Sequence, residues 1–363
     1  MSYLKKLYGL LIVLILTINP LLIASVQGAN NDSLYLNKIA IVYFDIGYKI
    51  DIVDNIAYIC SNDGIEIINI ENPKRPKKIS RISLTDGAFA LEIKNDTIFI
   101  AADSAGLVIA NISNPNEPVI VSQLPMLGSA NCIETKDNYC YLSHVNGETD
   151  IINITDITEP SHVKELTSYS YDDLEVRNDL MYCASQHIGL QILNVTDPVN
   201  PTIVNSLGSV IGARAITIKE NVLYLGCHLY GIKAISIADP QNIFLLNAAN
   251  QNDGGEAIGI DYSNNYLGVA DFSGVEVYNI SAPSTLTKLC EYRQGISSAH
   301  DLKVVGNYLY AGILQGLGIF EISNTKRAYF PPYLYYVLPI IIVIIGGVIS
   351  LLIIRRRKMR VEQ

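Results

Sequence analysis

Short segments rich in Ile, Val, Leu and Tyr alternate with polar turns over most of the chain. One representative unit runs from Ala90 to Leu124, and Asn95-Asp96 marks its first tight turn. Its apolar segments predict four strands, at Ala90–Lys94, Thr97–Ala101, Leu107–Ile112 and Val119–Leu124. Consecutive short strands separated by such turns predict an antiparallel meander.

The same pattern occurs seven times, at a spacing of 41 to 43 residues. The units end at Pro or at an equivalent residue, namely Pro73, Pro115, Ile157, Pro198, Pro240, Pro283 and Thr325. This period is typical of four-stranded propeller blades. Strands that are apolar on both faces must be covered on both sides, which a ring of blades achieves. We therefore predict an all-β fold, a seven-bladed β-propeller over residues 33–325.

The last unit has space for only three strands before a long apolar segment begins. A candidate for its fourth strand lies at the other end of the chain, where Lys38–Tyr43 resembles the strand Lys78–Ser83. We therefore expect the N-terminal strand to complete the last blade, which removes an exposed sheet edge.

Two stretches of the repeat carry a family resemblance. Residues Gly106–Pro115 read GLVIANISNP, and residues Gly189–Pro198 read GLQILNVTDP. These stretches resemble the LVIVD-repeat family of seven-bladed propellers found on many cell-surface proteins. The resemblance covers about residues 38–325 and implies the fold but no common activity. The chain departs from the family where Asn or another residue replaces a frequent Asp, at Asn69, Asn111, Asn153, Asn194, Ser236, Asn279 and Glu321.

Both ends of the chain have features of a membrane protein. Lys5 and Lys6 precede an apolar stretch and small residues, so residues 1–29 predict a signal peptide, with an uncleaved anchor as the alternative. Residues 334–354 are uncharged and apolar, which corresponds to about 31 Å of helix and predicts a transmembrane segment. Residues 326–333 are then a juxtamembrane linker, and 355–363 form a basic cytoplasmic tail. The propeller is expected outside the cell membrane.

Charge and cysteine content narrow the classes of function. The formal net charge is −9, with much of the basic charge in the tail, and an acidic propeller argues against nucleic acid as a partner. Cys60 and Cys227 occupy equivalent positions in separate blades. Cys132 and Cys140 flank one turn, but the expected register pairs Cys140 with Thr135. Buried free thiols are therefore expected rather than disulfides.

The topology of a propeller separates candidate residues by face. Loops between the second and third strands and loops between blades share the top face, whereas the Asn/Asp-Pro turns share the bottom. Eight residues gather near the top and are candidates for binding a ligand: His144, His187, His228, His300, Arg214, Asp172, Asp173 and Asp301. Unrelated, solvated loop residues are the alternative interpretation.

A carboxylate recurs at one position of the innermost strand. It is found in five units, as Asp51, Glu92, Glu134, Glu175 and Asp261. Thr217 and Lys303 hold the same position in the other two. Five acids around one channel repel each other unless water or a cation separates them, so the ring is a candidate Ca²⁺ site, with a water-filled channel as the alternative.

Six sequons for N-glycosylation are present, at Asn31, Asn95, Asn111, Asn153, Asn194 and Asn279. Most of them hold the same repeat position, so Asn there is also expected simply to cap the following turn.

Three functions fit these features. A non-enzymatic receptor or adhesion module that offers its top face to a protein or glycan is the leading hypothesis. A metal-dependent hydrolase or lyase at the channel mouth is the second, since propeller active sites leave no linear motif. A structural component of the cell envelope is the third.

Overall fold

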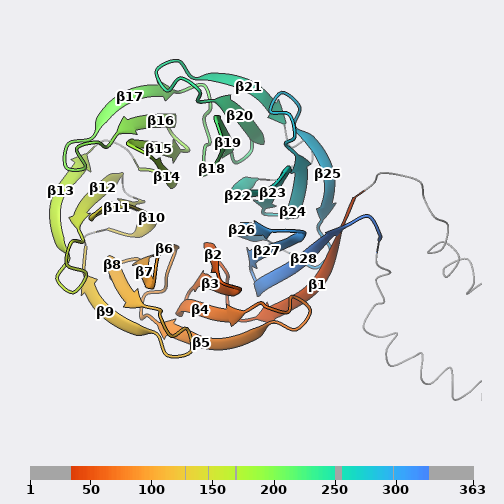
Figure 1. Ribbon diagram of the computed structural model, residues 1–363, viewed down its shortest axis with the longest axis horizontal. Helices are drawn as coiled ribbons and strands as arrows, with labels where there is room; N and C mark the ends of the chain where they lie inside the picture. The colour runs from red at the N-terminus through yellow and green to blue at the C-terminus, as the bar shows by residue number, and fades with distance from the viewer. Residues whose placement is uncertain are drawn as a thin grey trace, which may run out of the picture. The chain divides into compact units, whose positions relative to one another are not determined.

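The computed structural model describes residues 34–326, except 127, 146, 168–169, 250–255 and 297. In this part of the chain, 28 strands form seven four-stranded antiparallel sheets arranged as blades around a central axis (Figure 1). The seven-bladed all-β propeller expected from the repeats is therefore confirmed. The predicted signal peptide, most of the linker, the transmembrane segment and the tail lie outside the described residues. Within those residues, none of the elements is a long apolar helix of the kind that spans a bilayer.

Each blade contains four strands, in chain order from the axis to the rim except in blade 7, whose outermost strand is the N-terminal one. Blades 1 and 2 contain β2 (Ile50–Val53), β3 (Ile56–Ser61), β4 (Gly64–Asn69), β5 (Lys77–Ser83), β6 (Ala90–Lys94), β7 (Thr97–Ala101), β8 (Leu107–Asn111) and β9 (Val119–Leu124). Blades 3 and 4 contain β10 (Ala130–Lys136), β11 (Tyr139–His144), β12 (Glu148–Asn153), β13 (Ser161–Thr167), β14 (Asp173–Arg177), β15 (Leu180–Ser185), β16 (Gly189–Asn194) and β17 (Thr202–Leu207).

Blades 5 to 7 continue the same order. They contain β18 (Ala215–Lys219), β19 (Val222–Gly226), β20 (Ile232–Ser236), β21 (Phe244–Ala249), β22 (Ala257–Ser263), β23 (Tyr266–Asp271), β24 (Gly274–Asn279), β25 (Thr287–Tyr292), β26 (Ala299–Val305), β27 (Tyr308–Ile313), β28 (Gly316–Ser323) and the N-terminal strand β1 (Tyr35–Tyr43).

The strand β1 closes the ring, as the sequence predicts. It pairs antiparallel with β28, and the register places Leu36 opposite Ile322 and Val42 opposite Leu317. Gly316 begins β28 with a φ of +123°, a backbone conformation that favours glycine. A Cβ atom there would lie directly against the carbonyl oxygen of Val42, so the closing pair requires glycine at this position.

The hydrophobic core lies between neighbouring blades rather than at the axis. Ile65 and Ile67 of blade 1 pack in one buried cluster with Ile98 and Ile100 of blade 2. All four side chains are fully buried. Burial of one such side chain stabilises the fold by about 1.5–3 kcal/mol. Because each blade is covered by two others, the repeats stabilise one another around the ring.

Turns on the bottom face are held by side chains of Asn and Asp. Asn69, Asn111 and Asn153 each accept a hydrogen bond through Oδ1 from the backbone N–H two residues later, at 3.0, 3.0 and 2.8 Å. Asp156 and Asp197 repeat the arrangement three residues after the Asn of their own turn, at 2.9 and 3.1 Å. These Asx turns explain the polar residues that recur at the end of each third strand.

Candidate functional site

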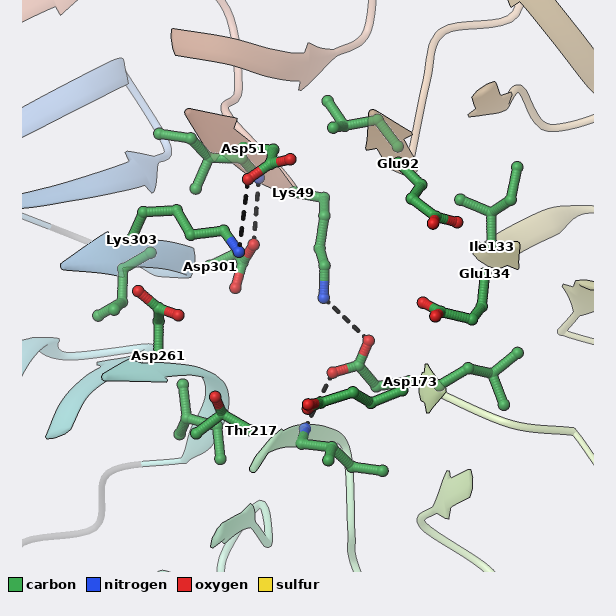
Figure 2. A pocket seen from close by; sticks show the side chains of 17 residues that line it. Lys49, Asp51, Glu92, Ile133, Glu134, Asp173, Thr217, Asp261, Asp301 and Lys303 are labelled. Carbon is green, nitrogen blue, oxygen red and sulfur yellow. Dashed lines mark hydrogen bonds and ion pairs between the residues drawn. The ribbon is translucent and has the colours of Figure 1, made fainter. Parts of the chain in front are cut away.

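The first strands of the seven blades surround a cavity of about 300 Å³ in the central channel (Figure 2). The five predicted carboxylates and their two substitutes all line it: Asp51, Glu92, Glu134, Glu175, Thr217, Asp261 and Lys303. A second set of lining charges comes from the residue two positions earlier in three blades: Lys49, Asp173 and Asp301. The propeller topology predicts Asp173 and Asp301 on the top face, but both residues line the channel.

Several of these carboxylates bind the backbone of the next blade. The N–H of Val304 donates to Asp261 at 2.7 Å, and the N–H of Val176 donates to Glu134 at 3.1 Å. The N–H of Ile50 donates to Asp301 at 3.1 Å. The innermost strand of each blade is an edge of its sheet. Its N–H groups that point away from the sheet therefore have no strand partner. The carboxylates therefore satisfy buried donors that would otherwise be costly.

Two lysines neutralise one side of the channel. Lys303 Nζ lies 3.5 Å from Asp51, and Lys49 Nζ lies 2.9 Å from Asp173. Burial disfavours the charged form of Lys49, but the carboxylates of Asp173 and Asp301 raise its pKa well above the usual value. The Lys303 pKa is also raised because Asp261 and Asp51 outweigh burial. Both side chains are therefore ammonium ions at neutral pH.

Three carboxyls on consecutive blades have no such partner among the described residues. Burial raises the pKa of Glu92 and of Glu175 to about 7. Burial and the neighbouring Glu92 raise the pKa of Glu134 well above its usual value. Burial also raises the pKa of Asp261 to about 6, although Lys303 lies close to it. Near neutral pH the arc formed by Glu92, Glu134 and Glu175 therefore holds both protons and negative charge.

A row of aromatic side chains crosses the top of blades 6, 7, 1 and 2. Ring centroids lie 6.1 Å apart for Phe272 and His300, 5.5 Å for His300 and Tyr48, and 5.1 Å for Tyr48 and Phe89. His300 Nδ1 donates to the Gly47 carbonyl at 2.9 Å, and burial lowers its pKa, so the imidazole is neutral. Phe272 is 41% exposed and ends the row at the surface.

The opposite part of the mouth is polar and ion-paired. Arg214 Nε lies 3.6 Å from Asp172, and the N–H of Gln186 donates to the same carboxylate at 2.9 Å. His228 Nε2 lies 2.7 Å from Glu256. His187 and His228 lie in second-to-third loops, as predicted; His187 is exposed and His228 is partly exposed. The mouth therefore combines an aromatic side with a charged side.

Comparison with known proteins identifies the repeat. Residues 88–124, 127–171, 254–293 and 296–326 match the sequence profile of the LVIVD repeat. The chain contains LVIVD repeats. The matched segments correspond to blades 2, 3, 6 and 7 of the LVIVD propeller. A comparison with curated proteins gives no match.

Solved structures support the fold of the LVIVD propeller. The β-propeller domain of Cps50 (Swd1) from Myceliophteria thermophila is 11% identical, with a TM-score of 0.66, and the alignment covers 79% of this chain and 100% of that one. The Pan2 WD40 domain of Neurospora crassa is 12% identical, with a TM-score of 0.62 and coverage of 82% and 98%. The RRP9 WD40 repeats are 10% identical, with a TM-score of 0.62 and coverage of 79% and 97%. At these identities the likeness shows the fold alone.

The Asn residues that depart from the LVIVD pattern keep its geometry. Asn111, Asn153, Asn194 and Asn279 accept the N–H two residues later at 2.8 to 3.0 Å. An Asn or an Asp oxygen serves equally as this acceptor, so the substitution removes a charge and preserves the turn. The capping role expected for these sequon residues is confirmed. Asn95 lies in a hairpin turn with a φ of 54°, and Asn31 lies outside the described residues.

His144 is not a surface residue, which corrects its predicted place in a loop. It is the last residue of β11, and its side chain is fully buried. Its Nε2 lies 2.8 Å from Asp150, whose other oxygen lies 2.8 Å from Nε2 of His162. The repeat period predicts where the β11–β12 hairpin turns, but β11 extends one residue further. The imidazole of His144 therefore points inward.

A recurrent buried carboxylate on the third strand is not among the residues predicted from the sequence. Glu66 and Glu276 are fully buried. Lys78 and Arg81 form ion pairs with Glu66, while Lys288 and Arg293 lie 3.0 and 2.7 Å from Glu276. Asp150 holds the same position in blade 3. The sequence signal that could have predicted these pairs is a basic residue twelve positions after each acid. The ion pairs hold the fourth strand against the third.

Metal ligation and disulfides give two further results. No set of three or more His, Cys, Asp or Glu side chains converges as metal ligands within the described part of the chain. All six cysteines lie in that part and are free thiols, five buried and Cys290 half-buried, as expected. Thr135 pairs with Cys140 in the predicted register, so Cys132 lies away from it.

Proposed function

We propose that this LVIVD-repeat propeller is a non-enzymatic binding module of the cell surface, which presents its top face to a protein or glycan. β-Propeller repeat proteins often mediate protein binding. The observation that carries the proposal is the composition of the channel mouth, where the row from Phe272 to Phe89 faces the ion-paired Asp172 and Arg214. Aromatic faces and paired charges are typical of surfaces that bind other molecules.

The loops around the mouth add exposed apolar side chains. Each lies between the second and third strands of its blade, in blades 3, 5, 6 and 7: Val145, Leu229, Tyr230, Phe272 and Leu314. The bottom turns instead use their polar side chains to cap their own backbone. The top face therefore offers the contacts that a partner needs, and the bottom face is the better candidate for the side near a membrane anchor.

The test uses photo-cross-linking in intact cells that express the full-length protein. A photoreactive amino acid replaces Tyr230 on the top face, and in a matched variant it replaces Phe244 on the rim strand β21. Both side chains are about half exposed, at 48% and 52%. We expect a discrete adduct from position 230 that disappears in Arg214→Ala/Phe272→Ala protein. Adducts only from position 244, or adducts unaffected by the double substitution, would reverse the assignment.

Membrane attachment is part of the proposal and has its own test. The signal-like start and the basic segment after residue 354 support an outside propeller and an inside tail. Protease added to intact cells should release a fragment of nearly the whole chain. Full protection of the propeller until the membrane is opened would contradict the orientation.

A further inference from the structure

We infer that the arc of Glu92, Glu134 and Glu175 is a site for one organic ammonium group, either a small amine or a lysine side chain of a partner protein. The inference rests on the proposed binding function and specifies its ligand. It is carried by the cavity, by the uneven distribution of cations around it and by carboxyl oxygens that have no partner.

The two lysines of the channel pair with carboxylates outside the arc. Figure 2 shows Lys49 reaching across the centre to Asp173, with Glu92 and Glu134 on one side and Asp51, Lys303 and Asp261 on the other. On the Lys303 side, Asp51 has an ammonium partner at 3.5 Å. On the other side, no ion pair reaches Glu92, Glu134 or Glu175 from any residue that the structure describes.

Hydrogen bonds leave this arc unsatisfied as well. Glu92 Oε1 accepts from the Thr135 hydroxyl at 2.8 Å, but its Oε2 is buried and has no partner among the described residues. Glu134 Oε1 accepts from Val176 N–H at 3.1 Å. The Glu175 carboxyl lines the cavity, and no hydrogen bond to it is found within residues 34–326 as described. A buried oxygen without a donor, such as Glu92 Oε2, is costly.

The side chains above Glu92 and Glu134 are small. Blades 1 and 4 carry Lys49 and Asp173 at the upper channel position, whereas blades 2 and 3 carry Ala90 and Cys132 there. The ion pair of Lys49 and Asp173 therefore obstructs the channel above Asp51 and Glu175 but not above Glu92 and Glu134. An alkyl chain from the mouth would enter on that side, where Ile133 and Leu91 add apolar lining.

An ammonium group fits these acceptors better than the alternatives do. It supplies three N–H donors and one positive charge, and its alkyl chain tolerates the apolar lining. An anion would meet three carboxyls. A metal ion requires several converging ligands, and within the described residues no such set is found. The raised pKa values of Glu92 and Glu175, about 7, reflect the energy that a bound cation would relieve.

The test is calorimetric titration of the full-length protein with butylammonium, with N-acetyl-lysine methylamide and, as a neutral control, with butanol. We expect saturable binding of both amines and none of butanol. Affinity should rise from pH 5 to pH 8, because the carboxyls ionise while the amines stay charged. Binding should release protons, so the measured heat should change with the ionisation enthalpy of the buffer. Calcium chloride alone, titrated in parallel, examines the metal alternative.

Glu92→Gln and Glu134→Gln should each weaken amine binding at least tenfold at pH 8. Glu159→Gln, an exposed carboxylate on a bottom turn, is the matched control and should bind as the unmodified protein does. Thermal melting confirms that each variant is folded. The inference is overturned by absent amine binding, by binding that the two variants leave unchanged, or by stoichiometric calcium that displaces the amine. Selective cross-linking at position 230 in those circumstances would leave the proposed top-face function standing.

The same titrations distinguish the two possible sources of the ammonium group. A small amine as the natural ligand predicts that butylammonium binds as tightly as the lysine derivative. A lysine side chain predicts that the derivative binds more tightly and that Glu92→Gln also abolishes the adduct at position 230.

Discussion

Individual carboxyl groups in the channel serve two different purposes. Asp301, Asp261 and Glu134 hold the amide N–H groups of a neighbouring blade, whereas the Glu175 carboxyl lines the cavity without such a bond. The innermost strands therefore carry a residue that stabilises the fold, Asp301, and a residue available to a ligand, Glu175, while Glu134 combines a backbone hydrogen bond with a place in the arc. Substitutions at the two kinds of residue should have different effects.

Asp301 is the clearer case of a stabilising carboxylate. Asp301→Ala should lower the free energy of unfolding by about 1–3 kcal/mol, because the buried N–H of Ile50 loses its acceptor. Asp301→Asn keeps an oxygen at that place and should cost less. Urea unfolding measures both variants, and an alanine variant as stable as the unmodified protein would contradict the role.

Glu175 should make stability depend on pH. Its pKa is raised from 4.5 to about 7, so the folded state binds more protons than the unfolded state between those values. Its contribution is fully present below about pH 4.5 and is lost as the pH rises through about 7. Glu175→Gln should therefore flatten the decline in melting temperature from pH 5 to pH 8. An unchanged pH profile would show that the carboxyl is already ionised in the folded state.

At the scale of strands and turns, much could be predicted from the sequence. The second blade has the expected boundaries, except that β8 ends at Asn111 rather than Ile112. The register that pairs Thr135 with Cys140 follows from the turn residues alone. Such features depend on neighbouring residues and on the alternation of apolar and polar positions. The burial of His144 and the row of aromatic side chains could not be predicted in this way. They depend on the directions of side chains and on contacts with other blades.

The glycine at the start of β28 gives an element-scale prediction, with a glycine of the β26–β27 turn as its control. Gly316→Ala should destabilise the propeller by more than Gly306→Ala. Both positions have positive φ, +123° and +58°, but a Cβ at 316 meets the Val42 carbonyl whereas one at 306 has nothing within 4 Å. The strain of positive φ alone costs about 1–2 kcal/mol. The denaturant midpoints of the two variants measure which is less stable. Equal losses of stability would mean that β1 moves to accommodate the Cβ atom at no cost in free energy.

At the scale of the whole molecule, closure depends on a strand from the opposite end of the chain. Removal of residues 30–44 should leave blade 7 with three strands and an open edge along β28. The shortened protein should aggregate and melt at a lower temperature than the full-length chain. Static light scattering and thermal melting measure this, and an unchanged melting temperature would be evidence against a structural need for β1.

The ring also brings together residues that no local pattern relates. Lys49 and Asp173 belong to blades 1 and 4, and their ion pair forms only because the ring places these blades across the channel. The ring of carboxylates was predictable because it repeats with the period of the blades. The division of the channel into carboxylates paired with lysine and carboxylates without such a partner was not predictable. It depends on the directions in which the side chains of Lys49 and Lys303 extend.

The pairing of Tyr35 with Ser323 has a consequence for biosynthesis. The first strand leaves the ribosome early but has no partner until nearly the whole propeller has been made. At about 5–20 residues per second this delay is roughly 15–60 s. During that time the blades can form their local hairpins, but the ring stays open and its terminal edges are unprotected. Nascent chains should therefore need a holding chaperone until the last blade emerges.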